Sequence, residues 1–195
     1  MITVRNCHLS LLSLCLVFMA ALHASENSAE ILLEEYAKTP FGNVLFLRHA
    51  FAPGLDANGK PDNFDIDICS TQRNLDARGR QQAIDIGKSF ADQGIAFDKI
   101  LSSQWCRCQE TARLLRLGDV ISEPALNSGF KGLFDKQENL SALRQKLETL
   151  KVGNRKVLMV THYGTITAIT GSFVNSGGAV AYDTNTGESR IVRLK

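Results

Sequence analysis

The sequence predicts an α/β domain with three layers, α/β/α, built on a mostly parallel central sheet with an antiparallel edge. Short apolar or β-branched runs alternate along the chain with longer amphipathic stretches, which is the pattern of strands joined by crossover helices. A hydrophobic content of 44% with 22% charged residues is typical of one globular domain with a substantial core. We therefore expect a single domain over residues 25–195.

Residues 1–24 differ in character from the rest of the chain. Arg5 is their only charged residue, the run from Leu9 to Leu22 is almost wholly apolar, and Ala24 offers a small residue at a plausible cleavage point. This pattern predicts a secretory signal peptide over residues 1–24 and a secreted, periplasmic protein. An uncleaved membrane anchor is the alternative, but an apolar run of about 14 residues is short of the roughly 20 that a span needs. We expect no stable membrane insertion after signal removal.

The charge balance and the cysteines narrow the possible partners and the compartment. Removal of Arg5 with the signal lowers the formal net charge from +2 to +1, which provides no strong field to attract nucleic acid or an anionic membrane. Cys69, Cys106 and Cys108 remain of the five cysteines. In an oxidising compartment, an odd number predicts one disulfide and a spare thiol, with Cys69 bonded to Cys106 or Cys108.

The first half of the domain alternates as the fold class requires. Residues 27–39 can form an opening helix, and residues 42–47 form the first buried strand. A polar loop from Phe51 to Arg73 has a length that indicates a functional role. Asp76 then fits an N-cap for a helix that carries apolar residues on one face and ends at Gly94.

The second half continues the alternation. Asp135 and Glu138 fit a capping box that begins a helix with a leucine stripe up to Leu150. The turn at residues 185–187 joins a closing hairpin that supplies the antiparallel edge. The other expected elements are strands at 98–103, 119–122 and 156–161 and helices at 105–115 and 165–170.

Polar side chains follow three of the predicted parallel strands. Arg48–His49, Ser102–Ser103 and Thr161–His162 come directly after these strands, and Arg107 lies in the helix after the second. Ligands bind at the carboxyl ends of the strands in open α/β sheets, so we expect these groups to converge. Two guanidiniums, two imidazoles and backbone N–H groups suit a phosphoryl group.

A single Arg or His at a strand end is usually a solvated surface group. Here His49 and His162, the only histidines after the signal, occupy equivalent positions. No P-loop or G-x-G-x-x-G stretch supports nucleotide binding, no cysteine is followed by Arg six residues later, and no paired spacing supports zinc. We expect no metal and no cofactor, and imidazole is the remaining nucleophile.

Four sequence blocks in order resemble the histidine phosphatase superfamily, the phosphoglycerate mutase-like proteins of branch 1, in a small exported form. They are "LFLRHA", "NLDARGRQQA" (74–83), "SSQWCRCQETA" (102–112) and "VLMVTHYGTI", and together they run from Val44 to Ile166.

The resemblance implies a phosphoglycerate mutase-like fold and a role for each matching residue. His49 would attack phosphorus in line and become transiently phosphorylated, while Arg48, Arg107 and His162 would hold the non-bridging oxygens. Water would then hydrolyse the phosphohistidine. No metal is required, because the arginines supply the positive charge.

Two positions depart from the family pattern. Ala50 replaces the usual glycine, and Asn127 stands where many members have a glutamate that protonates the leaving group. Either another carboxyl substitutes, with Asp135, Glu123, Asp65 and Asp67 as candidates, or the leaving group needs little protonation, as in phosphohistidine. Each candidate also has an ordinary explanation: Asp135 as a helix cap, Glu123 as a surface charge, and Asp65 and Asp67 as turn formers.

The sequence thus predicts an exported, metal-independent phosphatase whose ligand is a small phosphorylated substrate or phosphate, with the oligomeric state left open. Gln72 and Arg73 are candidates for the pocket mouth, although Arg73 also fits a surface charge. A lipopolysaccharide-core sugar phosphatase is a plausible specific role, with phosphohistidine or small phosphoester hydrolysis as the alternative, and mutase activity is less favoured. The rival from another class is a binding protein that keeps the phosphate pocket but has lost turnover.

Overall fold

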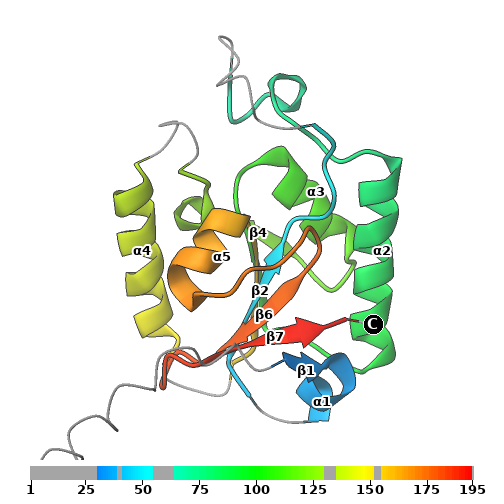
Figure 1. Cartoon of the computed structure of the whole chain (residues 1–195). Coiled ribbons are helices and arrows are strands. Elements are labelled where there is room, and N and C mark those ends of the chain that lie inside the picture. Colours follow the sequence, from blue (N-terminus) through cyan, green and yellow to red (C-terminus); the bar gives the residue numbers. More distant parts are fainter. Residues whose placement is uncertain (1–29, 39–40, 55–63, 130–134, 152–154, 195) are drawn as a thin grey trace, which may run out of the picture.

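A seven-stranded sheet forms the centre of the protein, with the strand order β1-β7-β6-β2-β5-β3-β4 (Figure 1). The computed structural model describes residues 30–38, 41–54, 64–129, 135–151 and 155–194. The strands are β1 (Glu30–Leu32), β2 (Val44–Arg48), β3 (Lys99–Ser102), β4 (Val120–Ser122), β5 (Val157–Thr161), β6 (Ala179–Tyr182) and β7 (Ser189–Arg193).

The pairing is mostly parallel, as the sequence predicts. Strands β2, β5, β3 and β4 pair in parallel, β6 pairs antiparallel with both β2 and β7, and β1 pairs in parallel with β7. The expected hairpin therefore forms, and Asp183 and Glu188 close its turn with a backbone hydrogen bond. β1 lies outside the hairpin and adds a parallel strand at that edge.

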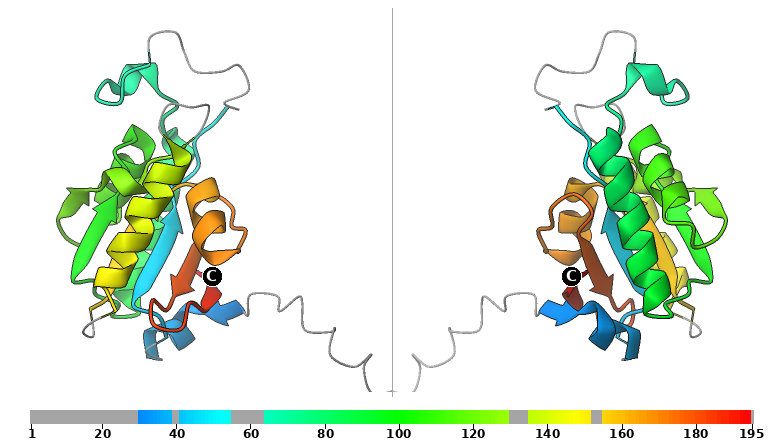
Figure 2. Two further views of the ribbon diagram at one scale, coloured as in Figure 1. Left: turned by 90° about the vertical axis from the view of Figure 1, so that its left-hand side faces the viewer. Right: turned by 90° about the vertical axis from the view of Figure 1, so that its right-hand side faces the viewer.

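Helices cover both faces of the sheet (Figures 1 and 2). They are α1 (Leu33–Lys38), α2 (Ala77–Asp92), α3 (Cys106–Leu114), α4 (Lys136–Thr149) and α5 (Tyr163–Thr170), with the short 3-10 helices η2 (Cys69–Thr71) and η3 (Pro124–Leu126). Buried residues of α1, α2 and α3 pack on one face of the sheet and those of α4 and α5 on the other. These are the three layers expected of a phosphoglycerate mutase-like fold.

The side-chain alternation of the central strands explains the two cores. In β2, Leu45 and Leu47 belong to one core cluster, while Val44 and Phe46 belong to the other. All four are fully buried, because helices cover both faces of the sheet. A continuous apolar run is therefore the correct signature for this strand.

The predicted helix starts are largely confirmed by their caps. The Asp76 side chain accepts a hydrogen bond from the Gly79 N–H, and the Asp135 side chain accepts from the N–H groups of Gln137 and Glu138. The prediction of an opening helix over residues 27–39 is wrong at residues 30–32, which form β1, because Ile31 packs in the core as part of an edge strand.

The predicted signal peptide, residues 1–24, lies outside the described residues. Among the described helices, none has both the length and the apolar character that a bilayer span requires.

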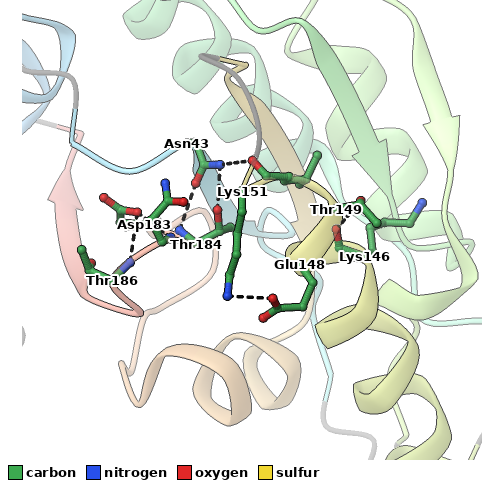
Figure 3. A network of polar contacts seen from close by, with 10 residues as sticks. Asn43, Lys146, Glu148, Thr149, Lys151, Asp183, Thr184 and Thr186 are labelled. Atoms are coloured by element: carbon green, nitrogen blue, oxygen red, sulfur yellow. Dashed lines mark hydrogen bonds and ion pairs between the residues drawn. The ribbon is translucent and has the colours of Figure 1, made fainter.

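A polar network lies at the end of the molecule where the parallel strands begin, opposite to their carboxyl ends (Figure 3). Asn43 Nδ2 donates to Leu150 O (2.7 Å) and to Thr184 Oγ1 (2.8 Å), and its Oδ1 accepts from the Thr184 N–H (3.0 Å). One amide side chain therefore ties the start of β2 to the segment after α4 and to the hairpin turn. Lys151 also forms an ion pair with Glu148 here.

Replacing this amide should measurably destabilise the fold. We expect Asn43→Ala to lower the free energy of unfolding by about 2 kcal/mol, because it leaves the buried Thr184 N–H without its acceptor. Asn185→Ala, at an exposed position in the same turn, should stay within about 0.5 kcal/mol of the parent. Urea denaturation measures both, and equal effects of the two substitutions would contradict the proposed role of Asn43.

Candidate active site

The carboxyl ends of β2 and β5 and the first turn of α3 line one cavity of about 410 Å³. Arg48, His49, Arg107 and His162 all line it, as the strand-end positions predict. The rest of the lining comes from segments on either side of this cluster: Arg73, Ala125, Asn127, Ser128, Gly129, Lys136, Asn139, Leu140, Tyr163, Gly164 and Thr165.

Arg107 holds the two imidazoles in one cluster. Its Nε donates to Nε2 of His49 (3.1 Å), and its Nη2 lies 3.2 Å from Nδ1 of His162. The side chains are 3% exposed for Arg107, 3% for His49 and 4% for His162. Trp105 packs against the guanidinium, with its ring centroid 4.4 Å from the Arg107 Cζ. Residues from β2, α3 and β5 therefore meet at one buried point.

The hydrogen bonds of His49 determine which ring nitrogen carries its proton. Nδ1 lies 2.8 Å from the carbonyl oxygen of Ala50, which can only accept a hydrogen bond. The proton of the neutral ring is therefore on Nδ1. Nε2 keeps its lone pair, which accepts the hydrogen bond from Arg107. This is the tautomer that a nucleophilic Nε2 requires.

His162 has the opposite tautomer, because its Nδ1 accepts from a guanidinium that has no acceptor atom. Its Nε2–H donates to the Ser103 hydroxyl (2.9 Å), which in turn donates to Oδ1 of Asn127 (2.9 Å). Asn127 is 2% exposed and donates through Nδ2 to Gln104 Oε1 (2.8 Å). We call Ser103, Asn127 and Gln104 the His162 anchor.

Burial and positive charge keep both rings neutral. Desolvation, followed by the charge of Arg107, lowers the pKa of His49 to about 3, although the Ala50 carbonyl opposes this shift. The same two causes, in the same order, hold the pKa of His162 well below its ordinary value of 6.5. At neutral pH the lone pair of His49 is therefore available.

The other predicted arginines lie at the cavity, but Gln72 does not. Arg48 donates to Val174 O (2.9 Å) and stacks over Tyr163, and its Nε is buried without a hydrogen bond. Arg73 Nη1 donates to Ala52 O and Gly54 O and reaches the cavity wall. The assignment of Gln72 to the pocket mouth is wrong, because Gln72 Oε1 instead accepts from the Cys106 N–H (2.9 Å) at the start of α3.

A disulfide joins Cys69 to Cys106, and Cys108 is free and buried. The bond attaches the long loop to the first residue of α3, directly before Arg107. Burial raises the pKa of the Cys108 thiol to about 12, and its sulfur lies 3.5 Å from Nε2 of His162. Cys108 is therefore a packing residue in the wall of the site.

The motif residues outside the cavity fix the backbone around His49. Thr111 Oγ1 accepts from the Ala50 N–H, and Gln82 Oε1 accepts from the Phe51 N–H. A Cβ at Gly79 would lie 1.9 Å from Phe51 O, so only glycine permits this contact with α2. Ala50 is fully buried and does not adopt a positive φ, which explains why alanine is tolerated there.

None of the four candidate proton donors lines the cavity. Asp135 caps α4, and Asp65 accepts from the Asp67 N–H within the loop. Glu123 caps η3 and forms an ion pair with Lys146. The ordinary explanations therefore hold for Asp135, Glu123 and Asp65, and Asp67 lies in the same turn.

The sequence places Ser103 at the rim, but the His162 anchor, Trp105 and Tyr163 were not predicted as parts of the site. The double serine after a strand was the available signal for the His162 anchor, and the single tryptophan of the chain, close to Arg107, was the signal for Trp105. Within the described residues, no group of three or more His, Cys, Asp or Glu side chains could hold a metal ion.

Comparison with known proteins agrees with this geometry. Residues 65–145 match the model of the histidine phosphatase superfamily (branch 1). This region of the chain is similar to the superfamily. The matched region contains Arg107 and two of the four sequence blocks, residues 74–83 and 102–112. His49 and His162 lie outside the matched region, but they line the same cavity as Arg107.

Solved structures give the same fold at low identity. The putative phosphohistidine phosphatase SixA from Agrobacterium tumefaciens is 22% identical, with a TM-score of 0.51 and coverage of 78% of this chain and 96% of that one. The native mycobacterial glucosyl-3-phosphoglycerate phosphatase is 16% identical, with a TM-score of 0.53 and coverage of 76% and 95%.

A third similar structure is a phosphoserine phosphatase mutant from Entamoeba histolytica in complex with phosphoserine. It is 18% identical, with a TM-score of 0.53 and coverage of 76% of this chain and 93% of that one. No curated protein has a sequence that matches this chain.

The two tautomers can be measured directly. In ¹⁵N-histidine spectra of the anion-free protein, we expect the proton of His49 on Nδ1 and that of His162 on Nε2. Ser103→Ala removes the acceptor of His162 and should shift that ring towards a mixture of tautomers, whereas Ser103→Thr retains the hydroxyl and should restore it.

Ser102→Ala is the matched control, because Ser102 is equally buried and its hydroxyl donates to a backbone carbonyl rather than to a histidine. Each alanine variant should lose about 1 to 3 kcal/mol of stability, but only Ser103→Ala should change the histidine signals. An unchanged His162 spectrum in Ser103→Ala would refute the anchor.

The lowered pKa values predict acid sensitivity of the fold. The unfolded chain takes up protons on His49 and His162 below pH 6.5, while the folded chain does not until near pH 3 for His49, so stability falls as the pH falls through this window. Each ring contributes at most about 1.4 kcal/mol per pH unit.

Urea denaturation from pH 7 to pH 4.5, in buffers without phosphate or sulfate, measures this effect. The stability difference between the parent and His162→Gln should shrink as the pH falls, and the same should hold for His49→Asn. Parallel pH profiles for the parent and both variants would show that the imidazoles are not held neutral.

Proposed function

We propose that the protein is an exported, metal-independent phosphatase that hydrolyses a phosphomonoester or phosphoramidate through a phosphohistidine on His49. The observation that carries the proposal is the orientation of His49. Its Nδ1–H donates to Ala50 O, while the lone pair of its Nε2 faces Arg107. The match of residues 65–145 to the histidine phosphatase superfamily supports the proposal, and so do the phosphatases among the structures of the same fold.

In the proposed reaction, the phosphoryl group enters between His49 and Arg107 and replaces their mutual hydrogen bond. Arg48 and Arg107 donate to its non-bridging oxygens. His162 joins them after it takes up a proton on Nδ1, which the bound dianion favours, while its Nε2–H stays on Ser103. Arginines supply the charge that a metal ion supplies in other phosphoryl-transfer enzymes.

The lone pair of His49 Nε2 then forms the N–P bond as the P–O or P–N bond of the substrate breaks. The electron pair of the broken bond leaves with the leaving group. The ring acquires positive charge, and the hydrogen bond from Nδ1–H to Ala50 O stabilises it. Water attacks phosphorus in the second step, releases phosphate and restores the neutral ring.

Asn127 limits the substrate, because an amide cannot protonate a leaving group and no carboxylate occurs among the described residues that line the cavity. Leaving groups that need little protonation are therefore favoured, and a phosphoramidate such as phosphohistidine can carry its proton on the remote ring nitrogen. Small phosphoesters are the alternative, with a lipopolysaccharide-core sugar phosphate as the specific candidate.

Export to the periplasm is also part of the proposal. The apolar segment within residues 1–24 supports it, and so does the Cys69–Cys106 disulfide, because such bonds persist in oxidising compartments.

Asn127 also favours one second candidate function, a phosphate-binding protein without turnover. Acid-quench trapping with a ³²P-labelled phosphodonor separates the two functions. We expect label on His49, and His49→Ala should lose the label and at least about a thousandfold in kcat/KM. His162→Ala is the matched control, because it removes the other buried imidazole but should still be labelled, at a rate lower by about a hundredfold.

Tight phosphate binding without any label on His49 would contradict the phosphatase proposal and favour the binding protein. Label on His162 rather than His49 would contradict the assignment of the nucleophile.

A further inference from the structure

The cavity is larger and more positively charged than one phosphoryl group requires. Its volume of about 410 Å³ lies in the range of cavities that hold whole small molecules. Besides the arginines, Lys136 lines it, and the described lining residues include no Asp or Glu. A phosphoryl dianion therefore leaves positive charge uncompensated on the α4 side of the cavity.

Lys136 differs in its partners from Lys146 and Lys151, the lysines at and after the other end of α4. Lys146 forms an ion pair with Glu123, and Lys151 forms one with Glu148. Lys136 has no ion pair with any described residue, although it is exposed and lies in the cavity wall. Its charge is therefore available to a ligand.

The first turns of α4 present one face to the cavity. Lys136, Asn139 and Leu140 stand at positions i, i+3 and i+4, which lie on the same side of a helix, and all three line the cavity. Within the part of the chain that the structure describes, the Asn139 side chain makes only a long hydrogen bond, 3.4 Å from its Nδ2 to Asn127 O, so its second amide proton can donate to a ligand. This face therefore offers one cation and one amide donor beside an apolar contact.

The face is well placed for the leaving-group side of a substrate. α4 begins at the end of the sheet where the parallel strands terminate, next to α5 (Figure 1), and Asn127 lies between its first turns and the His162 ring. A substrate whose phosphoryl group contacts His49 would extend from there towards Lys136 and Asn139.

We propose that Lys136 and Asn139 bind a second anionic group of the substrate, a carboxylate or a second phosphate. The inference rests on the proposed function, because it takes the Arg48–His49–Arg107–His162 cluster as the phosphoryl site. The substrate class is then a small phosphorylated acid or a bisphosphate. A phosphomonoester of an uncharged alcohol, which has no second anionic group, would use the phosphoryl cluster alone.

Binding to the His49→Ala protein tests the inference without turnover of the ligand. Calorimetry compares two pairs of probes that differ by one anionic group: 3-phosphoglycerate with glycerol 3-phosphate, and fructose 1,6-bisphosphate with fructose 6-phosphate. We expect the second anion to tighten binding by about three- to tenfold in at least one pair, since one well-placed hydrogen-bonded charge contributes on this scale at an exposed site. The carboxylate pair and the phosphate pair distinguish the two sources of charge.

Lys136→Met in the same background retains the aliphatic stem but removes the charge, and it should reduce the preference to nearly onefold. Lys151→Met is the matched control, because it removes the same charge after the C-terminal end of α4, where Lys151 pairs with Glu148 (Figure 3) and does not line the cavity, and it should retain the preference. Salt should weaken the preference in the parent and have little effect in Lys136→Met.

Equal affinity within both pairs, or a preference that survives Lys136→Met, would overturn the second-anion site. Either result would leave the phosphatase proposal intact, because labelling of His49 is measured separately. Missing label on His49, with the binding preference present, would instead remove the phosphatase activity and keep the two-anion ligand.

Discussion

The contact of one guanidinium with two imidazoles is the interaction on which the candidate site depends. Arg107 sits between His49 and His162, donates to both and is almost fully buried with them. Such burial of three ionisable groups is costly unless their hydrogen bonds are satisfied. Neutral rings that accept from a cation satisfy that condition, and they also leave the His49 lone pair ready for an electrophile.

The surrounding fold serves this contact from three directions. The parallel strands β2 and β5 deliver the two histidines to adjacent positions at the same end of the sheet. α3 delivers Arg107, and the start of α3 is fixed by the disulfide and by Gln72. Asn127 stands where the resemblance implies a proton-donating acid, and here its Oδ1 instead accepts from Ser103, whose hydroxyl orients the His162 ring. This exchange explains how an amide can stand there without leaving a polar group unsatisfied.

Much of this was predictable from the sequence, because the strands end in functional residues. The apolar runs before Arg48 and His162, the helix after Asp76 and the leucine stripe of α4 each follow from side-chain period and capping chemistry. The convergence of Arg48, His49, Arg107 and His162 follows from the direction of parallel strands. The local sequence pattern was sufficient to place a residue wherever the helix or strand that carries it decides its position.

The errors arose where a residue's position depends on a distant part of the chain. Residues 30–32 have helical neighbours but pair with β7, which lies more than 150 residues later. Gln72 is polar and close to the site in sequence, yet the free N–H group at the start of α3 takes its side chain. The choice of Cys106 over Cys108 as the disulfide partner depends on which face of α3 meets the loop. The sequence also does not show that Lys146 and Lys151 pair with carboxylates while Lys136 lines the cavity, so it could not single out Lys136 as a candidate ligand.

A crystal structure of the protein soaked with orthovanadate tests the central claim most directly, because vanadate adopts the five-coordinate geometry of phosphoryl transfer. The account predicts vanadium bonded to Nε2 of His49, with Arg48, Arg107 and Nδ1 of His162 on the vanadate oxygens and Nε2 of His162 still on Ser103. Vanadate bound away from His49, or an Arg107 that stays on both imidazoles while vanadate binds elsewhere, would contradict it.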